Sequence, residues 1–425
     1  MSTDGFTHVP FSALAEVNPP RGALKLSLDS EVSFIPMGDV TESGRWVGRQ
    51  TRRFVEVRNG FTNFAEGDVL MAKITPCMEN GKGCLARGLV NGVGFGSTEF
   101  HVLRAKPESD SGYIHQWSLH AALRKQAKNS MTGSAGQQRV PSGFFDQFRI
   151  PAFPQPEQAK IAEVLGAVDR AIEETEALVA KQQRLKAGLM QDLLTRGIDA
   201  HGQLRAESTH AFKDSPLGRI PVDWEVRTLD HCVERNAPIC YGILMPGTGF
   251  DGGVPVVKVR DIVGGTILQD NLLLTDPKID GQYKRSRLRA GDLLITIRGT
   301  TGRIAPVPAS LDGANITQDT ARLRIDPAFS AEFFFFLLQS KLVQDQVELH
   351  TVGQAVKGIN IGDVRRIAFG LPGSDEQKEI AARLSAQEAE LGRCCREALK
   401  LRSLKTALMQ DLLTGRRRVT VLLPA

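Results

Sequence analysis

The sequence predicts an α+β protein with two pseudo-symmetric domains, each mixed α/β with many short strands, joined by two long antiparallel coiled-coil helices. Three observations predict this fold. Residues 157–195 recur without a gap as residues 376–414, 219 positions later. In both copies apolar residues alternate at spacings of four and three, as in a coiled-coil seam. The blocks before the two copies share the order of their motifs. The expected boundaries are 1–153 (first domain), 154–197 (first helix), 198–371 (linker and second domain), 372–418 (second helix) and 419–425 (tail).

The first block is expected to form short strands at residues 66–74, after a Gly-Asp turn, and at 97–104. A helix near 111–128 and a Gly-rich loop at 132–141 follow. The glycines at 92–96 lack the strand-then-helix setting and GK[ST] ending of a phosphate loop, so we interpret them as part of a strand. Asn18-Pro19-Pro20 imitates an amino-methyltransferase motif. Arg21 then stands where that motif needs an aromatic ring to stack on an extruded base, so we reject catalysis at Asn18.

The first long helix follows a proline-rich entry and begins near Glu157, whose charge suits a helix N-terminus. Its 39 repeated residues, at about 1.5 Å each, predict a length of roughly 58 Å. The expected seam is Ile161, Leu165, Val168, Ile172, Val179, Leu185, Leu189 and Leu193 in the first copy. In the second copy it is Ile380, Leu384, Leu391, Ala398, Leu401, Leu404, Leu408 and Leu412. The best partner for each helix is the other copy.

The second block repeats the plan of the first. After a linker-like segment at 197–221 come strands at 290–298 and 317–324, a helix near 331–347 and a Gly-rich loop at 351–360. The four phenylalanines at 333–336 are most simply core. Arg416, Arg417 and Arg418, after the second helix, are expected to form a basic tail.

Composition excludes several classes of protein. No window of about 18 apolar residues suggests a membrane span, and the N-terminus MSTDGFTHVP has no features of an export signal. The six cysteines show neither zinc spacing nor a disulfide framework, so we expect reduced thiols, no metal and a cytoplasmic protein. A net charge of +5 and a pI near 8.9 permit a DNA partner without demanding one.

Four passages carry a family resemblance: KDSPLGRIPVDWEVRTL at 213–229, KITPCMENGKGCL at 73–85 with GSTEF at 96–100, the entry into EQ-x-x-IA at Glu157 and Glu376, and LMQDLLT in both copies. In them the chain resembles the specificity subunit of Type I restriction–modification enzymes. One departure is that the first block has only residues 8–14 as a counterpart of the IPVDWEV lead-in.

The resemblance implies a non-catalytic subunit with two target-recognition domains, each reading one half of a split, asymmetric site in double-stranded DNA. The helices would act as spacer and dock two methyltransferase subunits, and restriction subunits would join through these. The chain itself would bind no cofactor, because the methyltransferase uses S-adenosylmethionine to methylate adenine N6. About 58 Å of helix matches about 17 base pairs. Inserting four residues into the first helix should therefore lengthen the gap by one to two base pairs, about 6 Å.

Base readout needs Arg or Lys for guanine and Asn or Gln for adenine. Loop residues of these types in the first domain are Gln137, Gln138 and Arg139, followed by Lys73, Asn80 and Lys82. In the second domain they are Lys357, Asn360, Arg298, Arg303 and Gln318. Phosphate contacts are expected from Lys258, Arg260, Lys284, Arg285, Arg287 and Arg289.

The helix ends keep matched polar residues that a seam alone does not require. We therefore predict methyltransferase docking by Met190, Gln191, Asp192, Met409, Gln410 and Asp411. Two alternatives stay open. A solitary DNA methyltransferase would bind S-adenosylmethionine by itself. A coiled-coil scaffold without DNA recognition would bind DNA weakly, without sequence preference and with a steep salt dependence.

Overall fold

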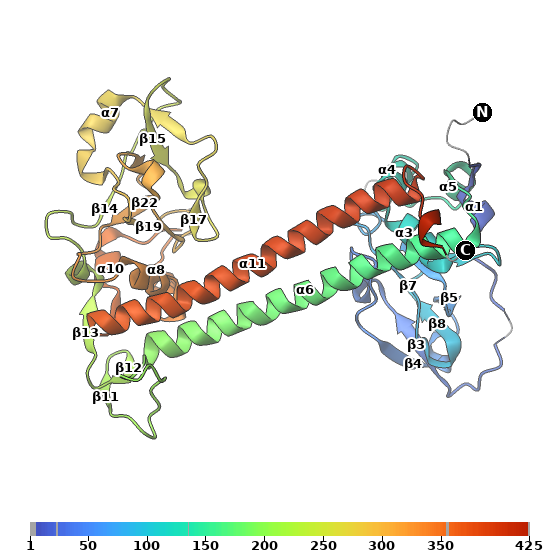
Figure 1. The fold of residues 1–425 in the computed structure, drawn as a ribbon, viewed down its shortest axis with the longest axis horizontal. Helices are drawn as coiled ribbons and strands as arrows, with labels where there is room; N and C mark the ends of the chain where they lie inside the picture. The colour runs from blue at the N-terminus through green and yellow to red at the C-terminus, as the bar shows by residue number, and fades with distance from the viewer. Residues whose placement is uncertain (1–5, 23, 135, 354–356, 424–425) are drawn as a thin grey trace. The chain divides into compact units, whose positions relative to one another are not determined.

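The computed structural model describes residues 6–22, 24–134, 136–353 and 357–423 (Figure 1). The chain separates into two compact units. One comprises Met1–Ala177 with Cys395–Ala425, and the other comprises Leu178–Cys394. The division cuts through both long helices, so the domain boundaries expected from the sequence stay predictions.

Two four-stranded sheets form the frame of the first domain. The first has the order β2-β9-β6-β7 and is antiparallel: Ala15–Val17, Phe100–Ala105, Val69–Ala72, Gly83–Leu85. The second has the order β4-β3-β8-β5, with β3 and β8 parallel: Gln50–Arg53, Glu31–Ile35, Val93–Gly96, Thr62–Ala65. A short ladder joins β1 (His8–Pro10) to β10 (Arg149–Pro151). The helices are α1 (Phe11–Leu14), α2 (Phe54–Val57), α3 (Ser111–Leu119), α4 (Ala121–Asn129) and α5 (Phe144–Gln147).

The second domain repeats this architecture. Its antiparallel sheet β14-β22-β19-β20 consists of Cys240–Tyr241, Thr320–Leu323, Leu293–Thr296 and Ile304–Pro306. A second sheet, β18-β15-β21, consists of Leu273–Thr275, Val254–Val257 and Asn315–Ile316. Small ladders pair β16 (Ile262–Val263) with β17 (Thr266–Ile267), and β13 (Glu225–Thr228) with β23 (Ala368–Leu371). The helices are α7 (Pro277–Gln282), α8 (Ala331–Gln339), α9 (Lys341–Leu349) and α10 (Ile361–Arg366).

The segment expected to be a linker contains a hairpin, β11 (Phe212–Ser215) with β12 (Gly218–Pro221), so the interpretation of residues 197–221 as a plain linker is wrong. The interpretation of residues 92–96 as part of a strand and its turn is confirmed, since Gly92 ends the turn η2 (Val90–Gly92) and Val93–Gly96 form β8. Residues 8–14 hold β1 and α1, and β1 pairs with β10 as β13 pairs with β23. The shortened lead-in of the first domain therefore still builds the equivalent ladder.

The Gly-Asp turns expected before β6 and β19 are confirmed. Gly67 and Gly291 have φ of 82° and 87°, a left-handed conformation that favours glycine. Each following aspartate is buried and accepts two hydrogen bonds from an arginine. Asp68 accepts from Arg104 on β9, and Asp292 accepts from Arg324, directly after β22. One ion pair therefore ties β6 to β9 and β19 to β22 in the two domains.

The single helix expected in each block is divided in two. His120 separates α3 from α4 and Ser340 separates α8 from α9, both with extended backbone. Each side chain accepts the backbone N–H of a residue in the following helix, Ala122 or Val343. The break follows because a residue that caps a new helix start leaves the helical conformation.

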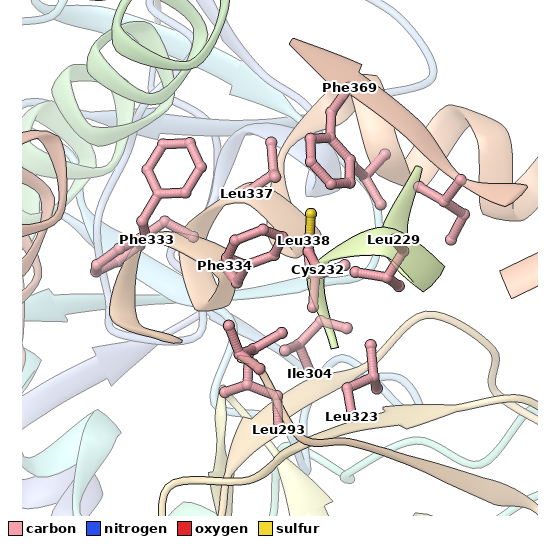
Figure 2. Close-up of a cluster of buried hydrophobic side chains, with 14 of the residues drawn as sticks. Leu229, Cys232, Leu293, Ile304, Leu323, Phe333, Phe334, Leu337, Leu338 and Phe369 are labelled. Carbon is pink, nitrogen blue, oxygen red and sulfur yellow. The ribbon is translucent and has the colours of Figure 1, made fainter. Parts of the chain in front are cut away.

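The phenylalanines at 333–336 lie in the core, as expected. Phe333, Phe334 and Phe336 are at most 2% exposed, and Figure 2 shows the first two among leucines of α8 and the β-strands. Together they anchor α8 against the sheet that carries the second domain's loops.

The two long helices are α6 (Gln155–Thr195) and α11 (Ser374–Leu413). Within each unit they lie side by side and antiparallel, joined by equivalent ion pairs. Lys405 pairs with Asp169 in the first unit, and Lys186 pairs with Glu388 in the second. The two ion pairs join equivalent positions of the repeat, because Glu388 and Lys405 lie 219 positions after Asp169 and Lys186. The helix that supplies the lysine in one pair supplies the carboxylate in the other. No helix in the described part of the chain is long and apolar enough to cross a membrane.

Most of the predicted seam is buried or half-buried, but the prediction that Leu185 and Leu404 lie in the seam is wrong. They occupy equivalent positions in the repeat and are 50% and 48% exposed. The next residue in each copy, Lys186 or Lys405, turns inward to its carboxylate partner instead. Each unit therefore presents an exposed leucine at the same place in the repeat.

Candidate nucleic-acid interface

The Gly-rich loop of the first domain is fixed to the strand end at Lys73. Thr132 and Arg139 pair through their backbones, and Val140 N–H donates to the Lys73 carbonyl at 2.9 Å. Thr75 N–H donates to the carbonyl of Gln138 at 3.0 Å. The structure thus brings Lys73, Gln138 and Arg139 together. Ala135, within this loop, lies outside the described residues.

Arg139 is oriented by Glu99, at the start of β9. Nη2 of Arg139 lies 2.8 Å from Oε1 of Glu99, and Nη1 donates to the Gln137 carbonyl. The Arg139 guanidinium lowers the pKa of Glu99 from its usual value. Because Glu99 accepts from Nε and Nη2 on one edge of the guanidinium, Arg139 keeps further N–H groups that can donate to a base.

The loop of the second domain makes the same backbone bonds with different side chains. Val352 pairs with Gly358, Ile359 N–H donates to the Ile297 carbonyl, and Gly299 N–H donates to the Lys357 carbonyl. Lys357 therefore stands where the first domain has Gln138, Gly358 where it has Arg139, and Arg298 where it has Ile74. Residues 354–356 of this loop lie outside the described residues.

A basic cavity of about 560 Å³ opens beside this second loop. Arg298, Arg303 and Arg260 line it with Gly299, Thr300 and Asp319. Arg303 is held by the carbonyl oxygens of Val259 and Ile262. Lys258 lies just before the cavity lining and is half-buried. Three predicted contact residues thus share one recess beside Lys357.

Other predicted contacts have intramolecular partners. Lys82 Nζ donates to the Met37 carbonyl at 3.2 Å, and Asn80 is exposed on the same turn. Asn360 caps α10 through the Asp363 N–H. The amide of Gln318, in the orientation that satisfies it, donates to the carbonyls of Ile243 and Leu244. Lys284, Arg285, Arg287 and Arg289 lie at a different cavity, and Arg287 is paired with buried Asp280.

Sequence reasoning missed three contributors. Glu99 and Asp319 are equivalent acidic residues beside the two loops, and they were already aligned by the strands at 97–104 and 317–324. Buried Arg124 donates to the carbonyls of Ser118, Met78 and Gly81, so it fixes the turn that carries Asn80. Burial lowers the pKa of Arg124 to about 10.

The rejected methyltransferase motif has a structural role. Asn18 Nδ2 lies 3.0 Å from His101 Nδ1, and its Oδ1 accepts the Val102 N–H. Asn18 therefore joins the end of β2 to β9.

The repeated Glu-Gln pair anchors each domain to a long helix. Gln158 accepts the Asp110 N–H and donates to the Phe153 carbonyl, and Gln377 bonds Ser330 and Pro372 in the same way. Asp110 and Ser330 are the N-caps of α3 and α8. Each buried glutamine thus locks a domain helix to the start of a long helix.

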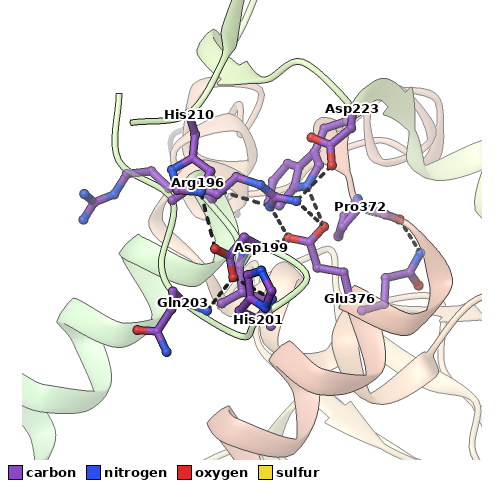
Figure 3. A network of polar contacts seen from close by, with 12 residues as sticks. Arg196, Asp199, His201, Gln203, His210, Asp223, Pro372 and Glu376 are labelled. Atoms are coloured by element: carbon purple, nitrogen blue, oxygen red, sulfur yellow. Dashed lines mark hydrogen bonds and ion pairs between the residues drawn. The ribbon is translucent and has the colours of Figure 1, made fainter. Parts of the chain in front are cut away.

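The glutamates close an equivalent network. Glu376 binds Arg205, the indole N–H of Trp224 and the backbone N–H of Ile198, and Figure 3 shows it beside Asp223. Glu157, which is 1% exposed, binds Arg418, whose guanidinium also lies over the rings of Phe6 and Phe153. The expectation of a free basic tail is therefore wrong for Arg418. Arg417 pairs with Asp411. The expected tail, residues 419–425, starts with Val419, which is buried. Residues 424 and 425 lie outside the described part of the chain.

The predicted docking residues are partly used within each unit. Met409 is buried and Met190 is half-buried, each against its own domain core. Asp192 pairs with Arg196, and Gln410 is half-buried. Gln191 is exposed. Exposed Leu185 and Leu404 lie five residues before Met190 and Met409.

Comparison with known proteins agrees with this architecture. The family described as "Type I restriction modification DNA specificity domain" matches residues 22–182 and 221–399. The Type I restriction enzyme EcoEI specificity subunit of Escherichia coli is 39% identical over 163 residues, which are 37% of this chain and 27% of that protein. The MjaVIII specificity subunit of Methanocaldococcus jannaschii is 25% identical over 303 residues, 70% of this chain and 68% of that one.

A solved structure shares the fold. The crystal structure of the Type-I restriction-modification system S subunit from M. genitalium superposes with a TM-score of 0.58 at 14% identity and covers 97% of both chains. The chain spans only about a quarter of the Escherichia coli relative, yet the family match covers well over half of this chain, in two segments. The relatives are named specificity subunits, in agreement with the non-catalytic subunit expected from the sequence. This chain therefore belongs to the Type I restriction modification DNA specificity domain family.

Proposed function

We propose that the chain determines which DNA sequence a Type I restriction–modification complex recognises. Each recognition domain reads one half of a split, asymmetric site in double-stranded DNA, and the paired helices set the gap. Two adenine-N6 methyltransferase subunits dock on the chain, and restriction subunits join through them. The chain binds no cofactor, since S-adenosylmethionine belongs to the methyltransferase, and it works in the cytoplasm.

One observation carries this proposal. The two Gly-rich loops make the same backbone hydrogen bonds to their strand ends but display different residues, Gln138 and Arg139 in one domain and Lys357 and Gly358 in the other. A shared frame fixes the position of each loop, whereas its side chains decide which base edges it can bind. Two equal frames with unlike side chains suit two unlike half-sites, whereas a symmetric dimer imposes a palindrome.

Docking of two methyltransferases is supported by the repeat. Leu185 and Leu404 are exposed at equivalent positions, although a purely intramolecular coiled coil would bury them. Each precedes the lysine that joins the two helices. A partner that covers one leucine can cover the other in the same way.

The test is to map methylated adenines genome-wide in cells that express this chain with its methyltransferase. The double variant Gln138→Lys, Arg139→Gly copies the second loop into the first. We expect one half of the recognised sequence to change while the other half and the gap stay the same. Lys125→Gln, which removes an exposed charge on α4, is the control and should leave the recognised sequence unchanged. A loop variant that methylates the original sequence with original preference would contradict the assignment.

A further inference from the structure

A second basic cavity, of about 600 Å³, lies in the second domain and shares no lining residue with the cavity beside Lys357. It is bordered by β14, the short helix η5 (Lys284–Ser286) and α10, of which Figure 1 labels β14 and α10. Its rim carries Lys284, Arg285 and Arg289, all exposed.

Some of its arginines are neutralised and others are not. Arg287 pairs with Asp280, Arg324 with Asp292, and Arg365 lies 3.6 Å from Asp230. Among the described residues, Lys284, Arg285, Arg289 and Arg322 have no ion-pair partner, and Asp312 is the one acidic residue of the lining. The cavity therefore presents unbalanced positive charge.

Arg322 forms part of the cavity wall from β22 and is 2% exposed. Its Nη2 donates to the Pro238 carbonyl at 2.9 Å, while its buried Nε has no acceptor. Burial lowers the pKa of Arg322. A buried cation with an unused donor is costly unless an anion compensates it.

The first domain shows that the fold does not need this arginine. Arg322 lies opposite Leu294 in its ladder, and Val102 lies opposite Leu70 at the equivalent place. Val102 is 2% exposed in an apolar cluster. The same strand position therefore holds valine in one domain and, in the other, a buried arginine without an ion-pair partner, which points to a ligand in place of a packing role.

The lining of the cavity also includes apolar residues, namely Pro238, Ile239, Tyr241 and Ile361. The Arg285 guanidinium lies 5.8 Å from the centre of the Tyr241 ring, and Tyr241 is 36% exposed. Cations and a partly exposed aromatic ring in one lining match a phosphate group joined to a planar base. The volume lies within the roughly 300–1,000 Å³ of small-molecule sites.

We propose that this cavity binds a nucleoside polyphosphate, with its phosphates on Arg322, Arg285 and Lys284 and its base against Tyr241. The buried position of Arg322 favours a small ligand over a DNA backbone, because a phosphate on a duplex surface would meet the exposed rim arginines before this recessed side chain. The site is separate from the loops that we assign to base reading.

The experiment is calorimetric titration of the full chain with ADP, pyrophosphate and, as the control lacking phosphate, adenosine. Arg322→Val copies the first domain, and the double variant Lys284→Gln, Arg285→Gln changes exposed residues that the fold does not depend on. We expect ADP and pyrophosphate to bind, and both variants to weaken binding by about tenfold or more, as for lost charge-assisted hydrogen bonds. Arg298→Gln, at the other cavity, should change ADP affinity less than about twofold, because it is not within hydrogen-bonding reach of this ligand.

Failure of the folded wild-type chain to bind ADP or pyrophosphate at about 1 mM would overturn the proposal. The proposal would also be overturned if the double variant Lys284→Gln, Arg285→Gln (the rim variant) bound ADP as tightly as the wild-type chain. If the rim variant instead weakens binding to every DNA sequence alike and ADP does not bind, the cavity holds a DNA phosphate and the small-ligand assignment is wrong. None of these results alters the recognised sequence of the wild-type complex, so the test is independent of the proposed function.

Discussion

The repeated glutamates give a sharp test of how the long helices are held, because their arginine partners differ in burial. The Arg205 side chain is 10% exposed and that of Arg418 is 36% exposed. Glu376→Ala leaves the buried Arg205 guanidinium with Asp223, which is 58% exposed, as its remaining carboxylate partner. It also leaves the Trp224 indole N–H and the Ile198 N–H without their acceptor. Removing one partner of a buried ion pair costs about 3–5 kcal/mol, so we expect that loss in the free energy of unfolding.

Glu157→Ala should cost less, about 1–3 kcal/mol, because Arg418 can regain water when its partner is removed. Glu379→Ala is the matched control on the same helix as Glu376. Its partner Arg383 lies one turn away at the surface, so the cost should be below about 0.5 kcal/mol.

The measurement is urea unfolding followed by tryptophan fluorescence, since Trp224 contacts Glu376 directly. Midpoints and slopes are compared together, because a change in slope would signal a change in the exposed surface. The double variant Glu376→Leu, Arg205→Met should recover most of the loss, since a buried ion pair can be replaced by apolar side chains. Equal costs for Glu376→Ala and Glu157→Ala would refute the role of burial in this account.

Three further predictions concern His115, the exposed leucines of the long helices and Arg124. His115 Nε2–H donates to the Gly44 carbonyl at 3.0 Å, and burial lowers the pKa of His115 to about 4. A depressed histidine pKa means that stability is full above the unfolded value near 6.5 and falls as pH drops toward 4, by up to about 3 kcal/mol. His115→Gln should flatten this slope in urea midpoints measured from pH 7 to 4, and an unchanged slope would contradict it. Leu185→Glu or Leu404→Glu should reduce co-purified methyltransferase from two copies to one, and the double variant to none, whereas full retention would exclude docking at these leucines. Arg124→Met removes the donor to three carbonyls, of which that of Met78 keeps the Gly81 N–H, and should weaken recognition of one half-site only, by about tenfold, in competition binding. Equal weakening of both half-sites would contradict its local role.

Much of the fold could be predicted because the duplication is written in the sequence. The two long helices, the Gly-Asp turns and the buried phenylalanines follow from periodicity, turn chemistry and hydrophobicity, which are local properties. The helix breaks at His120 and Ser340 were missed because both residues sit inside continuous helical patterns. Their capping role depends on the domain around them.

Other features depend on contacts between distant segments. Leu185 and Leu404 fit the heptad pattern, yet the lysines beside them face carboxylates more than 200 residues away in sequence and turn the helices outward there. Arg418 looked like part of a solvated tail because nothing in the local sequence shows that Glu157 is buried beside it. The roles of Glu99 and Asp319 could have been predicted, because the alignment of the two strand sequences already placed them at equivalent positions.

The base-contact candidates were predicted by residue type alone, and the structure shows why this is insufficient. Lys82, Asn360 and Gln318 all have intramolecular partners, whereas Lys357 and Arg298 are brought together by backbone bonds that no local pattern announces. Their contacts with DNA stay predictions.

The most direct test of the central claim lengthens both helices together. Seven residues inserted after Ala177 and seven after Cys394 preserve the heptad seam and add about 10 Å, or about three base pairs, to the paired segment. Adenine-methylation mapping of the wild-type and lengthened chains then compares the recognised sequences. We predict unchanged half-sites separated by a gap about three base pairs longer. An unchanged gap with both half-sites intact would show that the paired helices do not set the distance between the two reading loops.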